Sequence, residues 1–363
     1  MKVVIVGAGV AGLAIGWRLK QAGADVTVLE RAQPGRGATW AAAGMIAVAG
    51  EMGAAQTPEA EFGQHSSLLW PSFARELEVA SDLPIGYRRS GALMVARTAA
   101  EAAAFDSWSG VERLGAAQAL AKEPMLAGDI AAALWAPDEA QVDSRALGAA
   151  LAKAFEGCGG KLQRNEAAVR FEVRRGRAVA VASPFQRYEA DAFVLAAGAW
   201  SGEIGGLPPE ALPPVRPVKG EMIAVAPPAG AAMPRHVVWG NEVYLVPRND
   251  RLLIGATVAE AGFDSSVTDA AAGWLSSRAI VLMPALAKWD IVERWAGLRP
   301  GSPDGLPLLG RTAVAGLFAA TGQYRNGILF APAVAENMSR LVMEHAAEIP
   351  AFDPRRFPLT RRG

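Results

Sequence analysis

The first thirty residues combine a buried strand, a glycine turn and a helix in an order that few folds accommodate. Residues 3–6 are an uninterrupted run, VVIV, typical of a strand that is covered on both faces. This run leads directly into GAGVAG at residues 7–12, after which apolar residues recur at helical spacing. A second strand is expected over residues 25–29 and ends at Glu30. The segment is therefore predicted to be a βαβ unit of a Rossmann-type parallel sheet, which makes the fold class α/β.

Each glycine of this turn has its own structural purpose. Gly7 permits the tight turn after the strand, Gly9 lets the backbone approach a diphosphate, and Gly12 lets the helix pack closely on the strand. A diphosphate would lie on the helix N-terminus, where free N–H groups and the helix dipole favour negative charge. Glu30 can accept hydrogen bonds from both hydroxyls of a ribose, which argues against a 2′-phosphate. We therefore predict a dinucleotide site; the alternative is an ordinary glycine turn.

The overall composition describes a well-packed chain without a strong charge preference. Its 363 residues exceed one typical core, so we expect two joined lobes. Lys and Arg number 36 together, as do Asp and Glu, so no basic field favours nucleic acid. The single cysteine, Cys158, excludes an intrachain disulfide and fits a reducing cytoplasm. No uninterrupted apolar run approaches about 18 residues, so neither a membrane-spanning helix nor a membrane partner is expected.

Hydrophobic periodicity predicts a nucleotide-binding fold interrupted by a second sheet. Helices are expected over residues 59–80, 145–155 (with Asp143 or Ser144 as N-cap), 268–289 and 327–345, and alanine-rich helix and loop over 99–127. Strands are expected over residues 86–96, 161–181 (with a turn at Arg175-Gly176), 192–197, 222–226, 236–247, 251–257 (after a hairpin turn at Asn249-Asp250), 291–297 and 317–320. We assign residues 1–80, 140–212 and 295–363 to a discontinuous cofactor-binding domain. Residues 81–139 and 213–294 are predicted to form the inserted antiparallel-sheet domain.

Residues 38–46, ATWAAAGMI, are small, apolar and uncharged. Two interpretations are open at this point. The segment is either a helix packed tightly in the core or a backbone-rich wall against a flat ring, because glycine marks sites of close approach.

The chain lacks the motifs of hydrolytic and metal catalysis. No GxSxG elbow, no GxxxxGK[ST] phosphate loop and no HExxH pair is present. No metal site is therefore predicted. Any chemistry would come from a cofactor, with the protein supplying position and charge.

Three side chains are candidates for binding a substrate. Arg299 lies in the apolar segment WAGLRPG, where a guanidinium requires an anion: a ligand carboxylate, or a core Asp or Glu. Tyr244 alternates with apolar neighbours on a strand, where its usual role is a buried hydrogen bond to a backbone carbonyl. Arg325 precedes a helix, and its simplest interpretation is a solvent-facing loop residue.

A set of motifs in the same order along the whole chain resembles the D-amino acid oxidase family of FAD-dependent flavoenzymes, and within it the glycine oxidase branch. The matching motifs are GAGVAG with Glu30, AAAGM at 41–45, VLAAGAWS at 194–201, YLVPR at 244–248, GAT at 255–257, WAGLRPG at 295–301 and YRNGIL at 324–329. The resemblance implies a glutathione-reductase-like FAD-binding fold with an inserted antiparallel-sheet substrate domain. It further implies oxidation of a small amino acid, chiefly glycine, in thiamine biosynthesis.

The resemblance also assigns roles to individual residues. Arg299 would bind the substrate carboxylate, Tyr244 would support it, and Arg325 would meet the amino group through its carbonyl oxygen. The residues that would hold FAD are Gly7, Gly9, Val10, Ala11, Gly12, Glu30, Arg31, Ala38, Thr39, Ala43, Gly44, Met45, Val169, Gly198, Gln323, Tyr324, Arg325, Asn326, Gly327, Ile328 and Leu329. Val169 would touch the adenine through its backbone, and a helix starting at Gly327 would point its N-terminus at the flavin. Cys158 lies near no motif, so FAD is expected to be non-covalent.

The expected reaction yields an imine, then glyoxylate and ammonia, while dioxygen is reduced to hydrogen peroxide. Glu242 and Val258 depart from the residues common in the branch and are expected near the substrate pocket. The alternatives are an oxidase or dehydrogenase of another amine, such as sarcosine, a D-amino acid or an N-carboxymethyl amino acid, or a flavin subunit of an electron-transfer complex. A homo-oligomer is left open.

Overall fold

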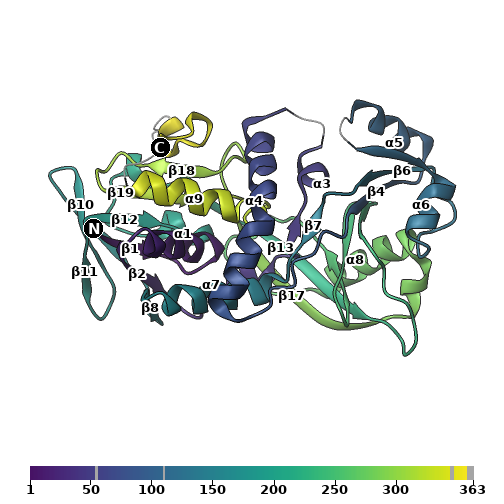
Figure 1. The fold of residues 1–363 in the computed structure, drawn as a ribbon, viewed down its shortest axis with the longest axis horizontal. Helices are drawn as coiled ribbons and strands as arrows, with labels where there is room; N and C mark the ends of the chain where they lie inside the picture. The colour runs from purple at the N-terminus through teal and green to yellow at the C-terminus, as the bar shows by residue number, and fades with distance from the viewer. Residues whose placement is uncertain (54–55, 109–110, 344–346, 358–363) are drawn as a thin grey trace.

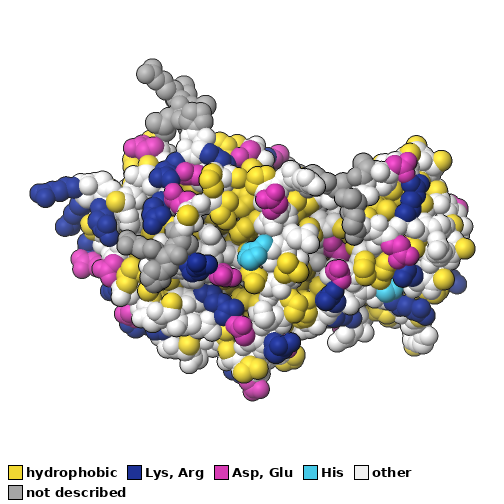
Figure 2. All heavy atoms as spheres, turned by 45° about the horizontal axis from the view of Figure 1, so that its top comes forward, with side chains coloured by type: hydrophobic (Ala, Val, Ile, Leu, Met, Phe, Trp, Pro, Cys, Tyr) yellow, Lys and Arg dark blue, Asp and Glu magenta, His cyan; other side chains and the backbone are white. Residues whose placement is uncertain are grey.

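The computed structural model of the chain describes residues 1–53, 56–108, 111–343 and 347–357. Two large sheets divide the molecule, one at each end of its long axis in Figure 1. Helix α4 (Pro58–Ser81) stands between them in that view. On the face shown in Figure 2, side chains of both charge signs are interspersed, as expected from the equal totals of basic and acidic residues.

The first sheet confirms the predicted βαβ unit and its parallel architecture. Its strand order is β18-β19-β12-β1-β2-β8, and all strands except the edge strand β18 are parallel. The strands are β1 (Lys2–Val6), β2 (Asp25–Glu30), β8 (Lys161–Arg164), β12 (Ala192–Leu195), β18 (Leu308–Arg311) and β19 (Leu317–Thr321). Helix α1 (Val10–Gln21) connects β1 to β2. The strand ends that meet the glycine turn therefore lie side by side along one edge.

Alternate residues of β1 enter two different cores. Val3 and Ile5 pack with helices α1, α4, α7 (Ser144–Gly157) and α9 (Ala331–Val342), which form one hydrophobic cluster. Val4 and Val6 face a three-stranded antiparallel sheet on the opposite side, made of β9 (Arg170–Arg174), β10 (Arg177–Ala182) and β11 (Arg187–Glu189). Coverage on both faces explains why the strand is apolar at every position after Lys2.

The second sheet has eight strands and is mostly antiparallel. Its order is β17-β13-β16-β15-β14-β4-β6-β5. These strands are β4 (Ala92–Ala96), β5 (Glu112–Gly115), β6 (Ala132–Ala136), β13 (Arg216–Ala226), β14 (Val237–Gly240), β15 (Val243–Pro247), β16 (Leu252–Gly255) and β17 (Asp290–Gly301). Helix α8 (Asp269–Leu282) packs on one face through Ile223, Leu245 and Ile254. The opposite face presents Met222 and Tyr244 toward Ala41 and Ala43.

The charge-free segment at 38–46 is helical only at its start, and its role as a wall against a flat ring stays a prediction. It begins as a single helical turn, α2 (Ala38–Ala41), and continues as extended backbone into β3 (Met45–Ile46). Strand β3 pairs with β7 (Ala140–Gln141), and the short helix α3 (Val48–Met52) follows it. Two further short α-helices are α5 (Ala99–Ala103) and α6 (Ala116–Lys122).

Local turn and cap chemistry predicted from sequence is confirmed at three places. Asp143 caps α7 by accepting hydrogen bonds from the N–H groups of Arg145 and Ala146. The β9–β10 turn contains Arg175 and Gly176, both with positive φ. Asn249-Asp250 joins β15 to β16.

Other element boundaries differ from the predictions. The strand expected over 236–247 is two strands, because Asn241 and Glu242 adopt positive φ (49° and 69°) and turn the chain between β14 and β15. The strand expected over 86–96 is regular only over β4, and β5 lies inside the stretch expected to be helix and loop. The helix expected over 268–289 ends at Leu282, ahead of Pro284, which cannot continue its hydrogen bonding.

The last helix also starts later than expected. Residues 327–330 form turns, and α9 begins at Ala331 with Pro332 in its first turn, a position that proline favours. The expected end at His345 lies outside the described residues. Within the described ranges, no helix is long and apolar enough to cross a membrane.

Candidate active site

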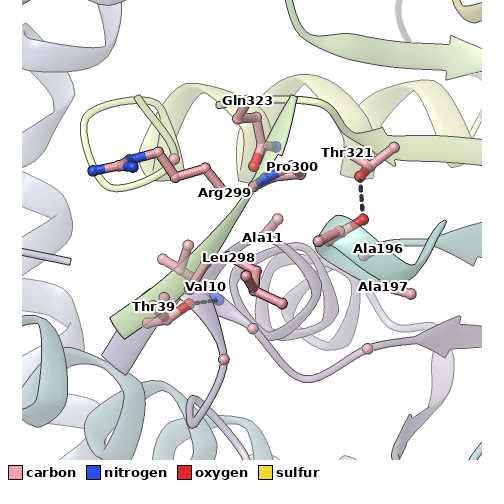
Figure 3. Close-up of a pocket in the computed structure, with 18 of the residues that line it drawn as sticks. Val10, Ala11, Thr39, Ala196, Ala197, Leu298, Arg299, Pro300, Thr321 and Gln323 are labelled. Carbon is pink, nitrogen blue, oxygen red and sulfur yellow. Dashed lines mark hydrogen bonds between the residues drawn. The ribbon is translucent and has the colours of Figure 1, made fainter. Parts of the chain in front are cut away.

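A cavity of about 430 Å³ runs between the two sheets. Its walls are the glycine turn, the end of β2, residues 35–45, the loop after β12, residues of β13, β15 and β17, and residues 320–328. Figure 3 shows Val10 and Thr39 joined by a hydrogen bond on the nucleotide side, and Arg299 extending from β17. One continuous space therefore joins the predicted dinucleotide site to the predicted substrate residues.

The glycine turn has the shape that a bound diphosphate requires. A Cβ at Gly7 would lie 2.4 Å from the carbonyl oxygen of Ala196, and one at Gly12 would lie 1.9 Å from the carbonyl oxygen of Gly7. At these two positions the fold itself excludes a side chain. At Gly9 a Cβ would meet only Thr39 Oγ1, at 3.5 Å, so this glycine keeps space open toward the cavity. The turn therefore fits the backbone approach expected for a dinucleotide.

Glu30 stands at the end of β2 and lines the cavity. One carboxylate oxygen accepts the N–H of Ala8 at 2.8 Å and the other accepts the N–H of Ala32 at 3.0 Å. These bonds fix the carboxylate beside the glycine turn, and each oxygen retains further acceptor capacity for a ribose hydroxyl. Thr39 accepts the N–H of Val10 at 2.9 Å and so ties residues 38–46 to the start of α1.

Arg31 and Val169 lie at the same end of the cavity. The Arg31 guanidinium stacks on the ring of Trp200, 3.4 Å from its centroid, and burial lowers the pKa of that guanidinium. Val169 donates its N–H to Ala182 at 2.8 Å and accepts the N–H of Gly205 at 2.9 Å. Its predicted backbone contact with an adenine would therefore use the second lone pair of its carbonyl.

The wall at residues 43–45 depends on one glycine and one buried arginine. Gly44 has a φ of 78°, and a Cβ there would lie 1.9 Å from the carbonyl oxygen of Val142. The guanidinium of Arg248 donates to the carbonyl oxygens of Ala43 and Val142 and to the side chain of Gln141. Burial lowers the pKa of Arg248 to about 10. This supporting role was not predicted, although Arg248 ends the quoted YLVPR motif.

Arg299 points into the cavity and has no acidic partner in the part of the chain that the structure describes. Its Nη1 donates to the carbonyl oxygen of Thr257 at 3.2 Å, and it packs against Gly220, where a Cβ would lie 2.2 Å from Nη1. Among the described residues, no carboxylate lies within 4.0 Å of its nitrogens. The interpretation as an internal ion pair is therefore excluded in that part of the chain. The guanidinium retains donors for a ligand carboxylate.

Tyr244 lies beside Arg299 and is buried. Its hydroxyl contacts Met222 Sδ at 3.7 Å, a weak acceptor, rather than the backbone carbonyl that a structural tyrosine usually finds. Burial raises the pKa of Tyr244, while the nearby Arg299 charge lowers it. Gly255, opposite on β16, makes room for the ring, since a Cβ there would lie 2.5 Å from the hydroxyl oxygen.

The Arg325 side chain is 36% exposed, as its simplest interpretation held, but it also lines the cavity and forms an ion pair there. Its Nε lies 3.1 Å from Glu51 Oε2, and the Glu51 side chain is only 10% exposed. Burial raises the pKa of Glu51, while Arg325 and Arg299 lower it. Sequence reasoning missed Glu51; the available signal was a lone carboxylate in the small, apolar stretch that follows AAAGM.

The loop from Gln323 to Ile328 closes the cavity with unsatisfied polar groups. Gln323 Nε2 and Asn326 Oδ1 are buried and have no hydrogen-bond partner among the described residues. Tyr324 donates its N–H to Pro300 at 3.0 Å, which attaches the loop to β17. Gly327 lies in a turn, so the helix N-terminus predicted there lies instead at Ala331. The loop, rather than a helix end, supplies polar groups to a ligand.

Most of the predicted site residues line this one cavity, with a few exceptions. Gly12 packs behind the turn, and Leu329 is buried, its carbonyl accepting from Ser66 at 2.7 Å and Trp70 at 3.0 Å. Glu242 and Val258, expected near the substrate, are absent from the lining: the Glu242 side chain is 64% exposed in a turn and Val258 is 57% exposed. The described residues contain no cluster of three metal-ligating side chains.

The fold and the cavity define a dinucleotide-dependent oxidoreductase, because a Rossmann βαβ unit and a substrate-sized space with a free guanidinium open into each other. The sequence profile of the DAO family, described as FAD dependent oxidoreductase, matches residues 2–341. The chain belongs to this family, and FAD is its cofactor. The residues present fit that cofactor: Gly9 leaves space open, and Gln323 offers an unpaired buried donor.

Individual proteins similar to this chain have names that specify a reaction more narrowly than the family description does. The chain is 36% identical, over 99% of its length, to the bifunctional protein ThiO/ThiG of Synechocystis, and it spans 54% of that relative. A crystal structure of glycine oxidase from Geobacillus kaustophilus superposes with a TM-score of 0.91 at 32% identity and 98% coverage of both chains. The iminodiacetate oxidase of Chelativorans sp. BNC1 superposes with a TM-score of 0.87 at 28% identity, covering 97% of this chain and 98% of that one.

Proposed function

We propose that the protein oxidises glycine with FAD and dioxygen, producing an imine that hydrolyses to glyoxylate and ammonia, and hydrogen peroxide. The observation that carries the proposal is Arg299: its guanidinium lines the cavity that joins the FAD site and has no acidic partner within the described ranges. The names of the relatives, glycine oxidase and ThiO/ThiG, support the substrate and a role in thiamine biosynthesis.

The substrate end of the cavity suits a small amino acid. The planar guanidinium of Arg299 matches a carboxylate in two parallel hydrogen bonds, and the Tyr244 hydroxyl beside it can donate to the same group. The backbone carbonyl of Arg325 would accept from the amino group. When bound, FAD would supply the redox chemistry, as acceptor of a hydride from the α-carbon and donor of electrons to dioxygen. The protein then contributes by holding the α-carbon in reacting geometry and excluding water, so no side chain need act as a base on that carbon.

The arrangement of the chain follows from the same proposal. Residues 1–80, 140–212 and 295–363 would bind FAD, and residues 81–139 and 213–294 would complete the substrate pocket. The boundary at 295 falls within β17, which carries Arg299 from the second sheet to the cofactor side. We propose non-covalent FAD, since Cys158 lies at the end of α7 and does not line the cavity. A cytoplasmic location and either monomer or homo-oligomer fit this function.

Peroxide release tests the proposal. The purified chain, loaded with FAD, is assayed with glycine, sarcosine, D-alanine and D-proline. Glycine is expected to give the highest kcat/KM. Arg299→Lys keeps the charge but loses the paired hydrogen bonds, so it is expected to raise KM for glycine roughly tenfold or more. A chain that takes up FAD but releases no peroxide with glycine would refute the proposal, as would an unchanged KM in Arg299→Lys.

A further inference from the structure

Among the described residues, the substrate end of the cavity is lined by two guanidinium groups and one carboxylate. Arg299, Arg325 and Glu51 all line it. The Glu51 carboxylate lies 3.1 Å from Arg325 Nε, whereas Arg299 has no carboxylate within 4.0 Å among the described residues. The pair at Arg325 is therefore internally balanced, and one positive charge is left to meet an anionic group of the substrate.

Glu51 is held in place by packing around its short helix. Helix α3 is capped by Glu139, which accepts the N–H of Ala49 at 2.7 Å. On its other side α3 lies against Trp239, close enough that a Cβ at Gly50 would be 2.9 Å from the ring. These contacts position the backbone that carries Glu51, and its side chain, only 10% exposed, lies against Arg325 rather than in solvent.

We propose that Glu51 is a specificity-determining residue: by occupying Arg325 it restricts the site to amines with one carboxylate and excludes those with a second carboxylate. This inference rests on the proposed function and names its substrate class. A second carboxylate beyond the nitrogen would meet the Glu51 charge instead of a free guanidinium. Like charges at short range in a partly desolvated site are costly. Glycine and sarcosine carry no such group, whereas N-carboxymethylglycine does.

Removal of the Glu51 charge is expected to turn repulsion of a second ligand carboxylate into attraction. In Glu51→Gln the Arg325 guanidinium loses its ionic partner, so two unpaired guanidinium groups would line one cavity. Each can bind a carboxylate through charge-assisted hydrogen bonds. A dicarboxylate would then gain an attraction where it previously met repulsion, and a monocarboxylate would gain little.

Binding of two unreactive acids measures this directly. Glycolate and diglycolate, whose ether oxygen replaces the amine of N-carboxymethylglycine, are titrated into the FAD-loaded chain by calorimetry. Glu51→Gln is expected to lower the ratio of the diglycolate Kd to the glycolate Kd at least tenfold, the effect of about one charge-assisted hydrogen bond. Glu242→Gln is the matched control, because it breaks a Glu–Arg pair of 3.0 Å, with Arg278, outside the cavity.

A second variant keeps the test decisive if Glu51→Gln does not fold. Arg325→Gln leaves the Glu51 carboxylate without its partner and should raise the same Kd ratio at least tenfold. A ratio that changes less than about twofold in the folded variant, an equal change in Glu242→Gln, or no glycolate binding to the unchanged chain would overturn the inference. A chain that binds glycolate and shows the predicted ratios but does not oxidise glycine would refute only the proposed function.

Discussion

Glu139 makes the stability of the protein depend on pH in a direction opposite to most carboxylates. Its side chain is buried, one oxygen accepts the N–H of Ala49 at 2.7 Å, and the other, Oε2, has no partner among the described residues. Burial, with a smaller contribution from the Glu51 charge, raises the pKa of Glu139 from 4.5 to about 8. The folded state therefore holds the proton more tightly than the unfolded chain does.

The sign and size of the effect follow from proton linkage. The stability that Glu139 contributes is complete below pH 4.5, falls as the pH rises toward 8, and is constant above that value. Between pH 6 and pH 9 the loss is about 3 kcal/mol, because one pKa unit corresponds to about 1.4 kcal/mol. For a chain of this length such a loss lowers Tm by about 4 °C. In Glu139→Gln the group cannot ionise, and this part of the pH dependence disappears.

Thermal unfolding at saturating FAD, from pH 6 to pH 9, tests this reasoning. The Tm of Glu139→Gln should equal that of the unchanged chain near pH 6 and exceed it by about 4 °C at pH 9. The two proteins share all other titratable groups, so the contributions of those groups cancel in the Tm difference at each pH. Glu112→Gln, at an exposed position on β5, is the control and should show no such divergence. A Tm difference that does not vary with pH would show that Glu139 is not the titrating group.

Three further predictions follow from the cavity. Glu30→Gln places an amide where the carboxylate accepts two backbone N–H groups, so it should weaken FAD binding about tenfold, measured by titration of the cofactor-free chain. Tyr244→Phe should raise KM for glycine severalfold with unchanged FAD affinity, and an unchanged KM would show that the hydroxyl does not meet the substrate. Gly44→Ala should lower stability by at least about 2 kcal/mol and reduce bound FAD, because its Cβ would lie 1.9 Å from a carbonyl oxygen at a positive φ. Its control is Gly23→Ala, also at positive φ but with nothing within 4 Å, which should keep FAD and lose less stability.

The parts of the fold that could be predicted were those determined by neighbours in sequence. The βαβ unit was predicted correctly because strand, turn, helix and Glu30 are specified within one short segment. The α7 cap and the Arg175-Gly176 turn are local for the same reason. Strand β6 (AALWA) lacks such a signal, since alanine favours helices and its pairing with β4 and β5 is non-local.

Site residues could be predicted where a charged side chain stands in an otherwise apolar segment of the sequence. Arg299 was identified because a guanidinium in an apolar segment needs an anion, but its lack of an internal partner is visible only in three dimensions. Glu51 and Arg325 are far apart in the chain, so their pairing could not be deduced from spacing. The start of α9 was misplaced because Gly327 was taken as its beginning, although Pro332 marks the first turn.

The position of β19 has a consequence for how the protein is made. This strand pairs with β12 in the first sheet, and the loop that follows it closes the cavity. On the ribosome, β1 and β2 emerge hundreds of residues before β19, so the nascent chain carries a glycine turn with an open side until β19 follows. The cavity for FAD is therefore complete only after residues 317–328 have left the exit tunnel.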